Sequence, residues 1–397
     1  MSRSAHPAGP RHADVLPEGH YSAPPTDLNA LDAKVWAETV TRDEDGVVTV
    51  GGIDVKRLAE EYGTPAYFLD EQDFRARARG WRTAFGSDAD VFYAGKAFLS
   101  RAVVRWLDEE GLNLDVCSGG ELATALSAGM PAERIAFHGN NKSTGEIRRA
   151  VEAGVGRIVL DSFQEIVRVA HIAQELGTRQ RVQIRITVGV EAHTHEFIAT
   201  AHEDQKFGIP LAGGQAAEAV RRALQLDGLE LIGIHSHIGS QIFDLSGFEV
   251  AAHRVVGLLK VIRDEHGVEL PEIDLGGGLG IAYTSDDDPR EPYEIAKTLT
   301  EIVTRECDAA RLTTPASPWS RAAPSSGRPP SRSTRSAPSS RSTGCGRTSP
   351  STAACRTTSG PRCTTPSTAS LSPPGSPTPS RRCAASSAST ARVVTSW

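Results

Sequence analysis

Short apolar runs recur along the chain at a fixed spacing. Four of them begin 22 residues apart, at Val91, Asn113, Ile135 and Arg157. Three more occupy residues 182–188, 229–235 and 272–275. Most of these runs are continuous and do not alternate with polar residues, which is typical of parallel strands covered on both faces. The pattern therefore predicts seven parallel strands.

Helical patterns lie between these runs, and three of them open with Ser-x-x-Glu. In this motif the serine and glutamate side chains accept hydrogen bonds from free amides at the start of a helix. The three pairs are Ser118 with Glu121, Ser143 with Glu146, and Ser162 with Glu165. A strand followed by a capped helix at a constant period predicts βα units, and hence an α/β fold.

A closed barrel of such units requires eight strands, because seven leave two open edges. The eighth strand should follow the helical pattern at 293–305, near residue 313, where the composition changes abruptly. We therefore predict a (β/α)8 TIM-like barrel over residues 36–311 that is incomplete, with seven of its eight strands. Residues 1–35 are polar and are predicted to be a flexible arm, and a hairpin at 46–55 is expected before a helix at 55–62.

Residues 312–397 differ from the rest of the chain in composition. Of these 86 residues, 49 are Ser, Thr or Pro, and none is Ile, Phe or Tyr. Such a segment cannot bury enough apolar surface to fold and is predicted to be disordered. It is either a natural low-complexity tail or an out-of-frame translation, and we favour the second interpretation. With G/C-rich codons, a shifted reading of the segment that begins at Ala316 gives Leu-Ala-Val-Glu-Pro-Gly-Arg, a sensible strand and turn.

The net charge of −6 is unevenly distributed. Residues 312–397 carry +11 from arginine alone, whereas residues 1–311 hold 32 basic and 49 acidic side chains, a net charge of −17. A body this acidic argues against nucleic acid or an anionic membrane as the main partner. The basic tail could dock to an anionic surface, but it lacks the interleaved aromatic residues that would favour this.

Cysteine content and hydropathy bear on the compartment. No apolar run approaches the ~20 residues needed to span a bilayer, and the N-terminus has no signal-peptide core. Residues 1–311 contain only Cys117 and Cys307, which fits buried thiols in a reducing compartment. We therefore expect a cytoplasmic protein.

Lys96 is the first candidate for chemistry. It follows the apolar run that starts at Val91, and barrels of this type place their active sites at the carboxyl ends of strands. Partial burial there would lower the pKa of the amine and favour a nucleophile that can form a Schiff base. Taken alone, the position suits an ordinary surface lysine better.

A second candidate is the segment that starts at His235, HSHIGSQ. Two histidines two positions apart could form one edge of a metal site, but no third ligand lies nearby, so we expect no metal. A ring-stacking His237 followed by Gly-Ser suits a planar aromatic cofactor that bears a phosphate. The Ser240 hydroxyl and neighbouring amides can donate to phosphate oxygens.

A third candidate is the glycine turn Gly276, Gly277 and Gly278, which follows the last apolar run. Glycines let the backbone approach an anion closely and adopt positive φ. Phosphate sites after the seventh and eighth strands are common in this barrel. The turn matches neither the dinucleotide-binding nor the P-loop pattern, which disfavours a nucleotide.

Two further polar features are less specific. The segment 193–202 holds His193, His195 and His202, and we expect it to be a substrate-facing loop because no cysteine pattern supports zinc. Arg185 lies in the fifth apolar run, so it is expected to be buried and to need an anionic partner. Asp115 or Glu121 could supply that partner, and a purely structural pair is equally consistent.

Taken in order, these segments resemble diaminopimelate decarboxylase, a fold-type III pyridoxal-phosphate (PLP) enzyme related to alanine racemase and eukaryotic ornithine decarboxylase. The resemblance covers roughly residues 30–311. The matching motifs start at Tyr93 (YAGKA), Leu112 (LNLDVCSGGEL), Phe137 (FHGNNK), His193 (HTH), Lys206 (KFGI), His235 (HSHIGSQI) and Asp274 (DLGGGLG).

The resemblance implies PLP as the cofactor. Lys96 would bind it covalently, His237 would stack on its ring, and Ser240 and Gly276–Gly278 would hold its phosphate. The implied reaction is decarboxylation of meso-2,6-diaminopimelate to L-lysine and CO2, the last step of lysine biosynthesis. The family is dimeric because each active site borrows residues from the partner subunit, so a homodimer is implied.

Two features of the family are missing from this chain. The family places Glu-Pro-Gly-Arg on the eighth strand, where the Glu keeps the pyridine nitrogen protonated, and adds a C-terminal β-domain that reaches the partner's site. Residues 312–397 contain neither, but the shifted frame recovers Glu-Pro-Gly-Arg. We therefore expect the chain as written to fold poorly and to have little activity.

Two alternative functions stay open. One is a sibling decarboxylase that acts on arginine, ornithine or carboxynorspermidine, because the usual substrate-reading residues lie in the missing part. The other is a non-catalytic PLP-binding remnant, which predicts a compact seven-strand body that still binds PLP.

Overall fold

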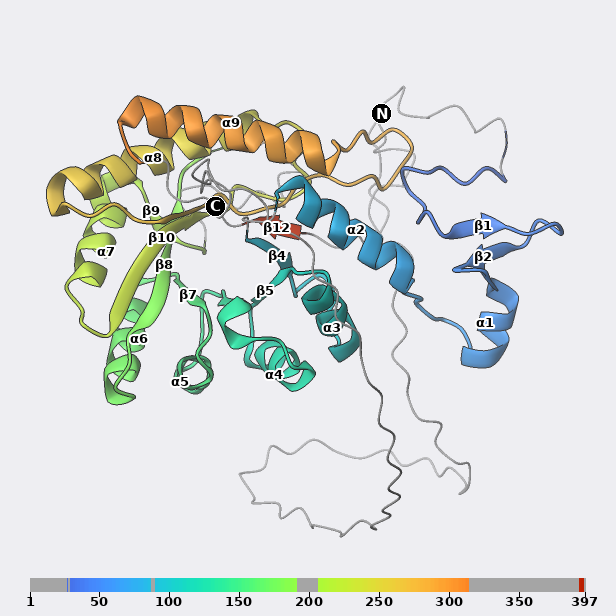
Figure 1. Ribbon diagram of the computed structural model, residues 1–397, viewed down its shortest axis with the longest axis horizontal. Helices are drawn as coiled ribbons and strands as arrows, with labels where there is room; N and C mark the ends of the chain where they lie inside the picture. The colour runs from blue at the N-terminus through green and yellow to red at the C-terminus, as the bar shows by residue number, and fades with distance from the viewer. Residues whose placement is uncertain (1–26, 28, 87–89, 191–205, 314–392, 396–397) are drawn as a thin grey trace, which may run out of the picture. The chain divides into compact units, whose positions relative to one another are not determined.

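A parallel sheet forms the centre of the protein in the computed structural model, which describes residues 27, 29–86, 90–190, 206–313 and 393–395 (Figure 1). Its strands are β4 (Val91–Ala94), β5 (Asn113–Val116), β6 (Ile135–Phe137), β7 (Arg157–Leu160), β8 (Gln180–Thr187), β10 (Leu229–Ser236) and β11 (Glu272–Asp274). Each strand pairs in parallel with the next in this order. The seven parallel strands predicted from the sequence are therefore confirmed.

Helices connect successive strands and lie along the outer side of the sheet (Figure 1). They are α3 (Arg101–Glu109), α4 (Gly119–Ala128), α5 (Thr144–Ala153), α6 (Phe163–Glu175), α7 (Gln215–Leu224) and α8 (Ser246–His266). A further helix, α9 (Pro292–Ala310), packs against α8 and against α2 (Glu71–Ala84). Every residue of β5 is buried because helices cover one face and the barrel interior the other, which explains the continuous apolar run.

The three predicted serine caps are present. Each serine accepts a hydrogen bond from the amide three residues further on, at Ser118, Ser143 and Ser162. Only the pair Ser143–Glu146 is reciprocal. The other two glutamates reach one residue further back, to the amides of Cys117 (2.5 Å) and Asp161 (2.7 Å). They thereby fix the residues that directly follow β5 and β7.

Smaller elements surround this sheet. The predicted hairpin consists of β2 (Val48–Val50) and β3 (Ile53–Asp54), which form a three-stranded antiparallel sheet with β1 (Val40–Arg42) before helix α1 (Val55–Tyr62). Short 3-10 turns span Ala132–Arg134 and Ala212–Gly214. Strand β9 (Ile209–Pro210) adds to β8, and β12 (Val393–Thr395) pairs antiparallel with β4. Most of the expected arm (1–35) and tail (312–397) lies outside the described residues.

A buried ion network shows how strongly the sheet curves. In the described part of the chain the sheet is open, with β11 at one end and β12 beyond β4 at the other. Arg157 on β7 nevertheless reaches both sides, with its guanidinium 2.8 Å from Glu272 on β11 and 2.9 Å from Asp90, just before β4. One side chain can span these positions only because the seven strands form a half-barrel.

Apolar side chains from the strands and the inner helix faces form one continuous buried cluster. Cys307 in α9 belongs to it, as predicted for a buried thiol. The same prediction is wrong for Cys117. This thiol is exposed because Cys117 directly follows the carboxyl end of β5. Of the helices in the described residues, none is both long and apolar enough to cross a membrane.

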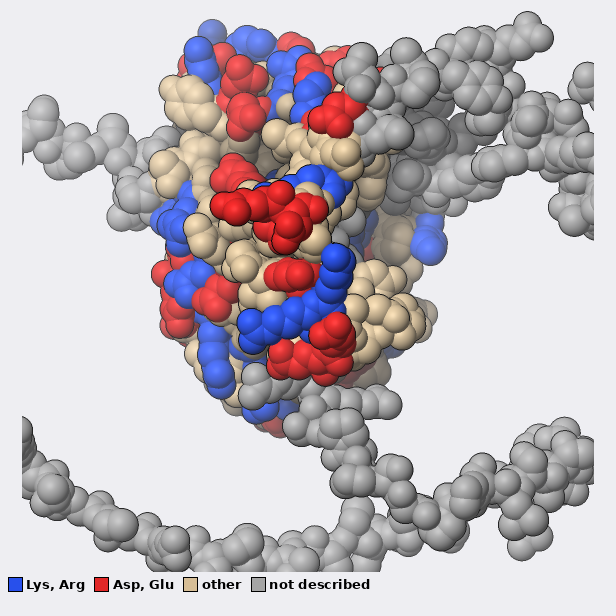
Figure 2. Space-filling view, turned by 90° about the vertical axis from the view of Figure 1, so that its right-hand side faces the viewer, with Lys and Arg blue, Asp and Glu red and all other residues tan. Residues whose placement is uncertain are grey.

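Acidic and basic side chains are interspersed on the face shown in Figure 2. Arg75 of α2 is representative of the pairing, because its guanidinium lies 2.6 Å from Glu110, just after α3, and 2.7 Å from Glu109. Interspersed charges of this kind give no large field of one sign, so this face offers no basic stripe for a nucleic acid.

Candidate active site

Buried polar side chains gather at the carboxyl ends of the parallel strands. Asp115 lies near the end of β5, His138 and Asp161 directly follow β6 and β7, and His235 and Asp274 lie at the ends of β10 and β11. Because the strands are parallel, these side chains meet at one edge of the half-barrel, which we call the carboxyl edge. Enzymes with this fold carry their active sites at that edge.

Lys96 lies at the carboxyl edge, two residues beyond β4. The turn that carries it lies close to β5, since the Gly95 amide donates to the Asp115 carbonyl (2.9 Å) and a Cβ on Gly95 would come within 2.8 Å of that oxygen. Lys96 is exposed, not partly buried as expected, because it projects from a turn beyond the strand. Its charge is one of the causes of the lowered pKa of His237, and both residues follow strands at the carboxyl edge.

His237 and Ser240 lie in the segment that follows β10. Burial, together with the charges of Arg185 and Lys96, holds the pKa of His237 well below its usual value. The imidazole is therefore neutral at pH 7. Ser240, in the same segment, is buried as well.

The glycine turn after β11 packs directly on this segment. Gly276 and Gly278 have φ angles of 73° and 95°. A Cβ on Gly276 would lie 2.5 Å from the Ser236 carbonyl oxygen, and one on Gly278 only 1.8 Å from that of Gly239. Imidazole atoms of His237 lie 3.1 and 3.2 Å from the same two Cβ positions. Glycine is thus required at both positions, and the turn and the His237 ring form one continuous wall.

Two imidazole–carboxylate pairs lie side by side at the carboxyl edge. His138 Nε2 is 3.2 Å from Asp115 Oδ1, His235 Nδ1 is 3.0 Å from Asp274 Oδ2, and the two rings meet edge to face with centroids 5.0 Å apart. Burial raises the pKa of Asp274 to about 6 and lowers that of His235 well below its usual value. Asp274 also accepts the Gly276 amide (2.8 Å), which ties the pair to the glycine turn.

Arg185 pairs with Asp161, so the predicted partners Asp115 and Glu121 are wrong. Its Nε lies 3.9 Å from Asp161 Oδ1, and its guanidinium carbon lies 4.7 Å from the centroid of the Phe207 ring. The reason is strand order. Arg185 is on β8, Asp161 follows the adjacent strand β7, and Asp115 is on β5, which is separated from β8 by two strands.

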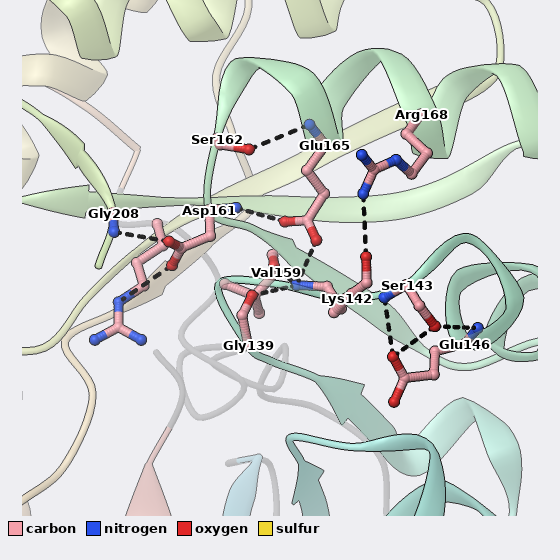
Figure 3. Close-up of polar contacts among 11 residues, drawn as sticks. Gly139, Lys142, Ser143, Glu146, Val159, Asp161, Ser162, Glu165, Arg168 and Gly208 are labelled. Carbon is pink, nitrogen blue, oxygen red and sulfur yellow. Dashed lines mark hydrogen bonds and ion pairs between the residues drawn. The ribbon is translucent and has the colours of Figure 1, made fainter. Parts of the chain in front are cut away.

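The loop after β6 is held by Lys142, the last residue of the FHGNNK motif (Figure 3). Its ammonium donates to the carbonyls of Gly139 (2.6 Å) and Val159 (2.8 Å) and lies 2.9 Å from Glu165 Oε1. These contacts could not be read from the sequence, because Lys142 lies in a loop and its partners come from three different segments.

The predicted cofactor residues all follow strands at the carboxyl edge. Lys96 follows β4, whereas His237, Ser240 and Gly276–Gly278 follow β10 and β11. The curvature of the half-barrel brings β4 and β11 toward each other, as the contacts of Arg157 show. The His138–Asp115 and His235–Asp274 pairs were missed, although each histidine lies at a predicted strand end. The segment 193–202, with its three histidines, lies outside the described residues.

Comparison with known proteins defines the relatives of this chain. Residues 71–316 match the family described as pyridoxal-dependent decarboxylase, pyridoxal binding domain. Diaminopimelate decarboxylase of Mycobacterium leprae is 55% identical over 321 residues, which cover 79% of this chain and 68% of that protein. The enzyme of the same name from Bacillus subtilis is 47% identical over 268 residues, which cover 67% and 61%.

Solved structures agree with the sequence relatives. A diaminopimelate decarboxylase from M. jannaschii superposes with a TM-score of 0.65 at 31% identity, over 70% of this chain and 65% of that one. The same enzyme in co-complex with L-lysine superposes with a TM-score of 0.63 at 32% identity, over 68% and 64%. The chain spans about two thirds of the length of these relatives.

The fold and the matched region define the class of protein first: an α/β barrel domain of the kind that binds pyridoxal phosphate in decarboxylases. Within that class, the chain belongs to the diaminopimelate decarboxylase family.

Proposed function

We propose that the described body of this chain is the PLP-binding domain of a decarboxylase that converts meso-2,6-diaminopimelate into L-lysine and CO2. The observation that carries the proposal is that Lys96, His237 and the glycine turn all lie at the carboxyl edge, with the His237 ring packed on the turn. The names of the relatives support the choice of substrate.

The residues at the carboxyl edge fit PLP, which presents an aldehyde, a planar ring and a phosphate. Lys96 offers an exposed amine for the aldehyde, and His237 offers a neutral ring for stacking. Ser240 and the glycine turn offer donors for the phosphate. Since the Gly276 amide already donates to Asp274, we assign the phosphate contacts to the amides of Gly277 and Gly278 and the turn geometry to Gly276.

Each of these residues has a defined task in the proposed reaction. Bound PLP would accept the electron pair left behind by the departing carboxylate. Lys96 would bind the cofactor covalently, and its Nζ would take up a proton when the substrate amine replaces it. His237, held neutral by burial and by neighbouring cations, would support the ring without adding positive charge. The His235–Asp274 pair would keep the glycine turn in place.

We also propose that residues 312–397 are an out-of-frame translation, and that the chain in its restored frame is a homodimer with a C-terminal β-domain. The composition of the segment and the recovered Glu-Pro-Gly-Arg support this, as does the end of the family match at residue 316. Sequencing the DNA across the codons for Glu306 to Ala323 tests the proposal. We expect one missing or extra base, and confirmation of the present frame would contradict it.

A substrate panel tests the proposed specificity. The 397-residue chain and the restored-frame chain, each with PLP, are offered meso-2,6-diaminopimelate, arginine, ornithine and carboxynorspermidine, and the amine products are separated by chromatography. We expect the restored-frame chain to form lysine and the 397-residue chain to form little of any product. Faster turnover of another substrate would favour a sibling decarboxylase, and PLP binding without any product in both chains would favour a non-catalytic PLP-binding protein.

A further inference from the structure

Lys142 is a buried lysine in the loop after β6, and it is not among the predicted cofactor residues. Its side chain is 1% exposed, and Nζ has three acceptors, the carbonyls of Gly139 and Val159 and the carboxylate of Glu165. An ammonium has three N–H donors, so all of them are used. The acceptors come from the loop after β6, from β7 and from α6, so one side chain joins three segments (Figure 3).

Glu165 extends this connection to Asp161. While Oε1 faces Lys142, its Oε2 accepts the Asp161 amide at 2.7 Å. Burial lowers the pKa of Lys142 and raises that of Glu165, and the charge of each partner opposes the shift of the other. Burying such a pair generally contributes little net stability compared with apolar residues of the same size. We therefore ascribe the role of the Lys142–Glu165 pair to the geometry that it imposes on the neighbouring segments, and not to a contribution to stability.

Asp161 carries the connection to the carboxyl edge. Its Oδ2 accepts the amide of Gly208 at 3.1 Å (Figure 3). Its Oδ1 faces Arg185 at 3.9 Å. In the loop after β6, the Asn140 amide group donates to the Lys206 carbonyl at 3.0 Å. The residues that follow β6 and β7 and the segment that starts at Lys206 are thus bonded to one another.

We propose that Lys142 and Glu165 are positioning residues. They fix the loops that follow β6 and β7, so that His138 and the Asp161–Arg185 pair take the arrangement needed at the carboxyl edge for PLP binding. The expected effect on PLP binding rests on the proposed function. The pair is also expected to restrain Gly208 through Asp161, and this effect on the protein can be measured without the cofactor.

The test replaces the pair by apolar residues of similar size in the full-length chain. Lys142→Met combined with Glu165→Met removes the bonds without leaving an unpaired buried charge, so the fold should persist. The matched control is Arg148→Met combined with Glu175→Met, because that exposed ion pair also joins α5 to α6. Two quantities are measured: amide hydrogen exchange by mass spectrometry without PLP, and the PLP dissociation constant from the absorbance of the bound cofactor.

In the double variant we expect amides of peptides that contain Asp161 or Gly208 to exchange faster, with unchanged exchange in β5. We expect the PLP dissociation constant to rise about tenfold, which corresponds to about 1.4 kcal/mol. The control variant should change neither quantity. A merely structural pair would leave the PLP dissociation constant unchanged at equal stability, and that result would overturn the proposal.

Glu165→Gln is the second variant, for the case in which the double variant does not fold. Its amide can still accept from Lys142 through Oε1, but its NH2 group cannot accept the Asp161 amide. Faster exchange at Asp161 and Gly208 with weaker PLP binding supports the proposal, and unchanged exchange at both overturns it. If the unsubstituted chain is folded but binds no PLP, the proposed function fails, while the exchange comparison still decides whether the pair restrains Gly208.

Discussion

The glycine turn has no room for even one added side-chain atom at Gly278. We predict that Gly278→Ala destabilises the protein by about 2 kcal/mol or more, because the residue has positive φ and its Cβ would meet the Gly239 carbonyl at 1.8 Å. PLP binding should weaken as well, since the turn would have to move. Urea denaturation measures the stability. Gly257→Ala in α8 is the control, because its Cβ meets nothing within 4 Å and helix propensity predicts a gain of up to about 1 kcal/mol.

The neutral His237 predicts a pH dependence of stability. Below about pH 6.5 the unfolded chain binds a proton at this residue that the folded chain does not, so the free energy of unfolding falls as the pH falls. Asp274 acts in the opposite direction, because its raised pKa of about 6 lets the folded chain bind a proton first.

We predict that His237→Phe makes the decrease in unfolding free energy between pH 7.5 and pH 5.5 smaller by up to about 1.4 kcal/mol per pH unit. Urea titrations at three pH values measure it. His171→Gln, at a histidine whose side chain is 69% exposed, is the control substitution. An equal decrease in wild type and His237→Phe would show that the imidazole titrates normally.

Sequence position was a good guide to single residues and a poor guide to their partners. Lys96 could be placed at a strand end because the apolar run before it is continuous. The partner of Arg185 could not be predicted, because it depends on which strand lies next to β8. Asp161 became the partner through the β7–β8 pairing, which the residue pattern alone does not determine.

Among the helices in the described part of the chain, α5 has the most completely capped start. Ser143 accepts the Glu146 amide, and the Glu146 carboxylate accepts both the amide and the hydroxyl of Ser143. We predict that Ser143→Ala lowers the free energy of unfolding by about 1 kcal/mol, measured by thermal or urea denaturation. Ser127→Ala, at an exposed helix serine that donates only to Thr124 O, should change it by less than about 0.5 kcal/mol. Equal effects of the two substitutions would show that the cap contributes nothing.

The regular elements were predictable because local rules determine them. The continuous runs predicted the seven consecutive parallel strands from β4 to β11 other than β9, and the Ser-x-x-Glu motifs marked three helix starts. Strands β9 and β12 were not predicted, because two or three residues carry no periodic pattern and the pairing partner is distant in sequence. The bonds of Lys142 were missed for the same reason, since they join three segments at once.

At the scale of the whole molecule, Arg157 joins the two ends of the curved sheet by ion pairs and so stabilises the half-barrel. Its side chain is 6% exposed and bonds to Glu272 and Asp90 from opposite ends of the sheet. We predict that Arg157→Met costs about 3–5 kcal/mol, because it leaves the Glu272 carboxylate buried without its main partner. Arg181→Met is the matched control, since Arg181 contacts the same carboxylate from a half-exposed position and should cost less than about 1 kcal/mol. Comparable losses in urea denaturation would contradict a special role for Arg157.

The central claim is that this half-barrel binds PLP through Lys96. The most direct test is to incubate the purified 397-residue chain with PLP, reduce with borohydride and locate the cofactor by peptide mass spectrometry. We predict a single modified peptide that contains Lys96, and its loss in Lys96→Ala but not in Lys56→Ala, at an exposed lysine in α1. Modification of another lysine, or of none in a chain shown by circular dichroism to be folded, would contradict the claim.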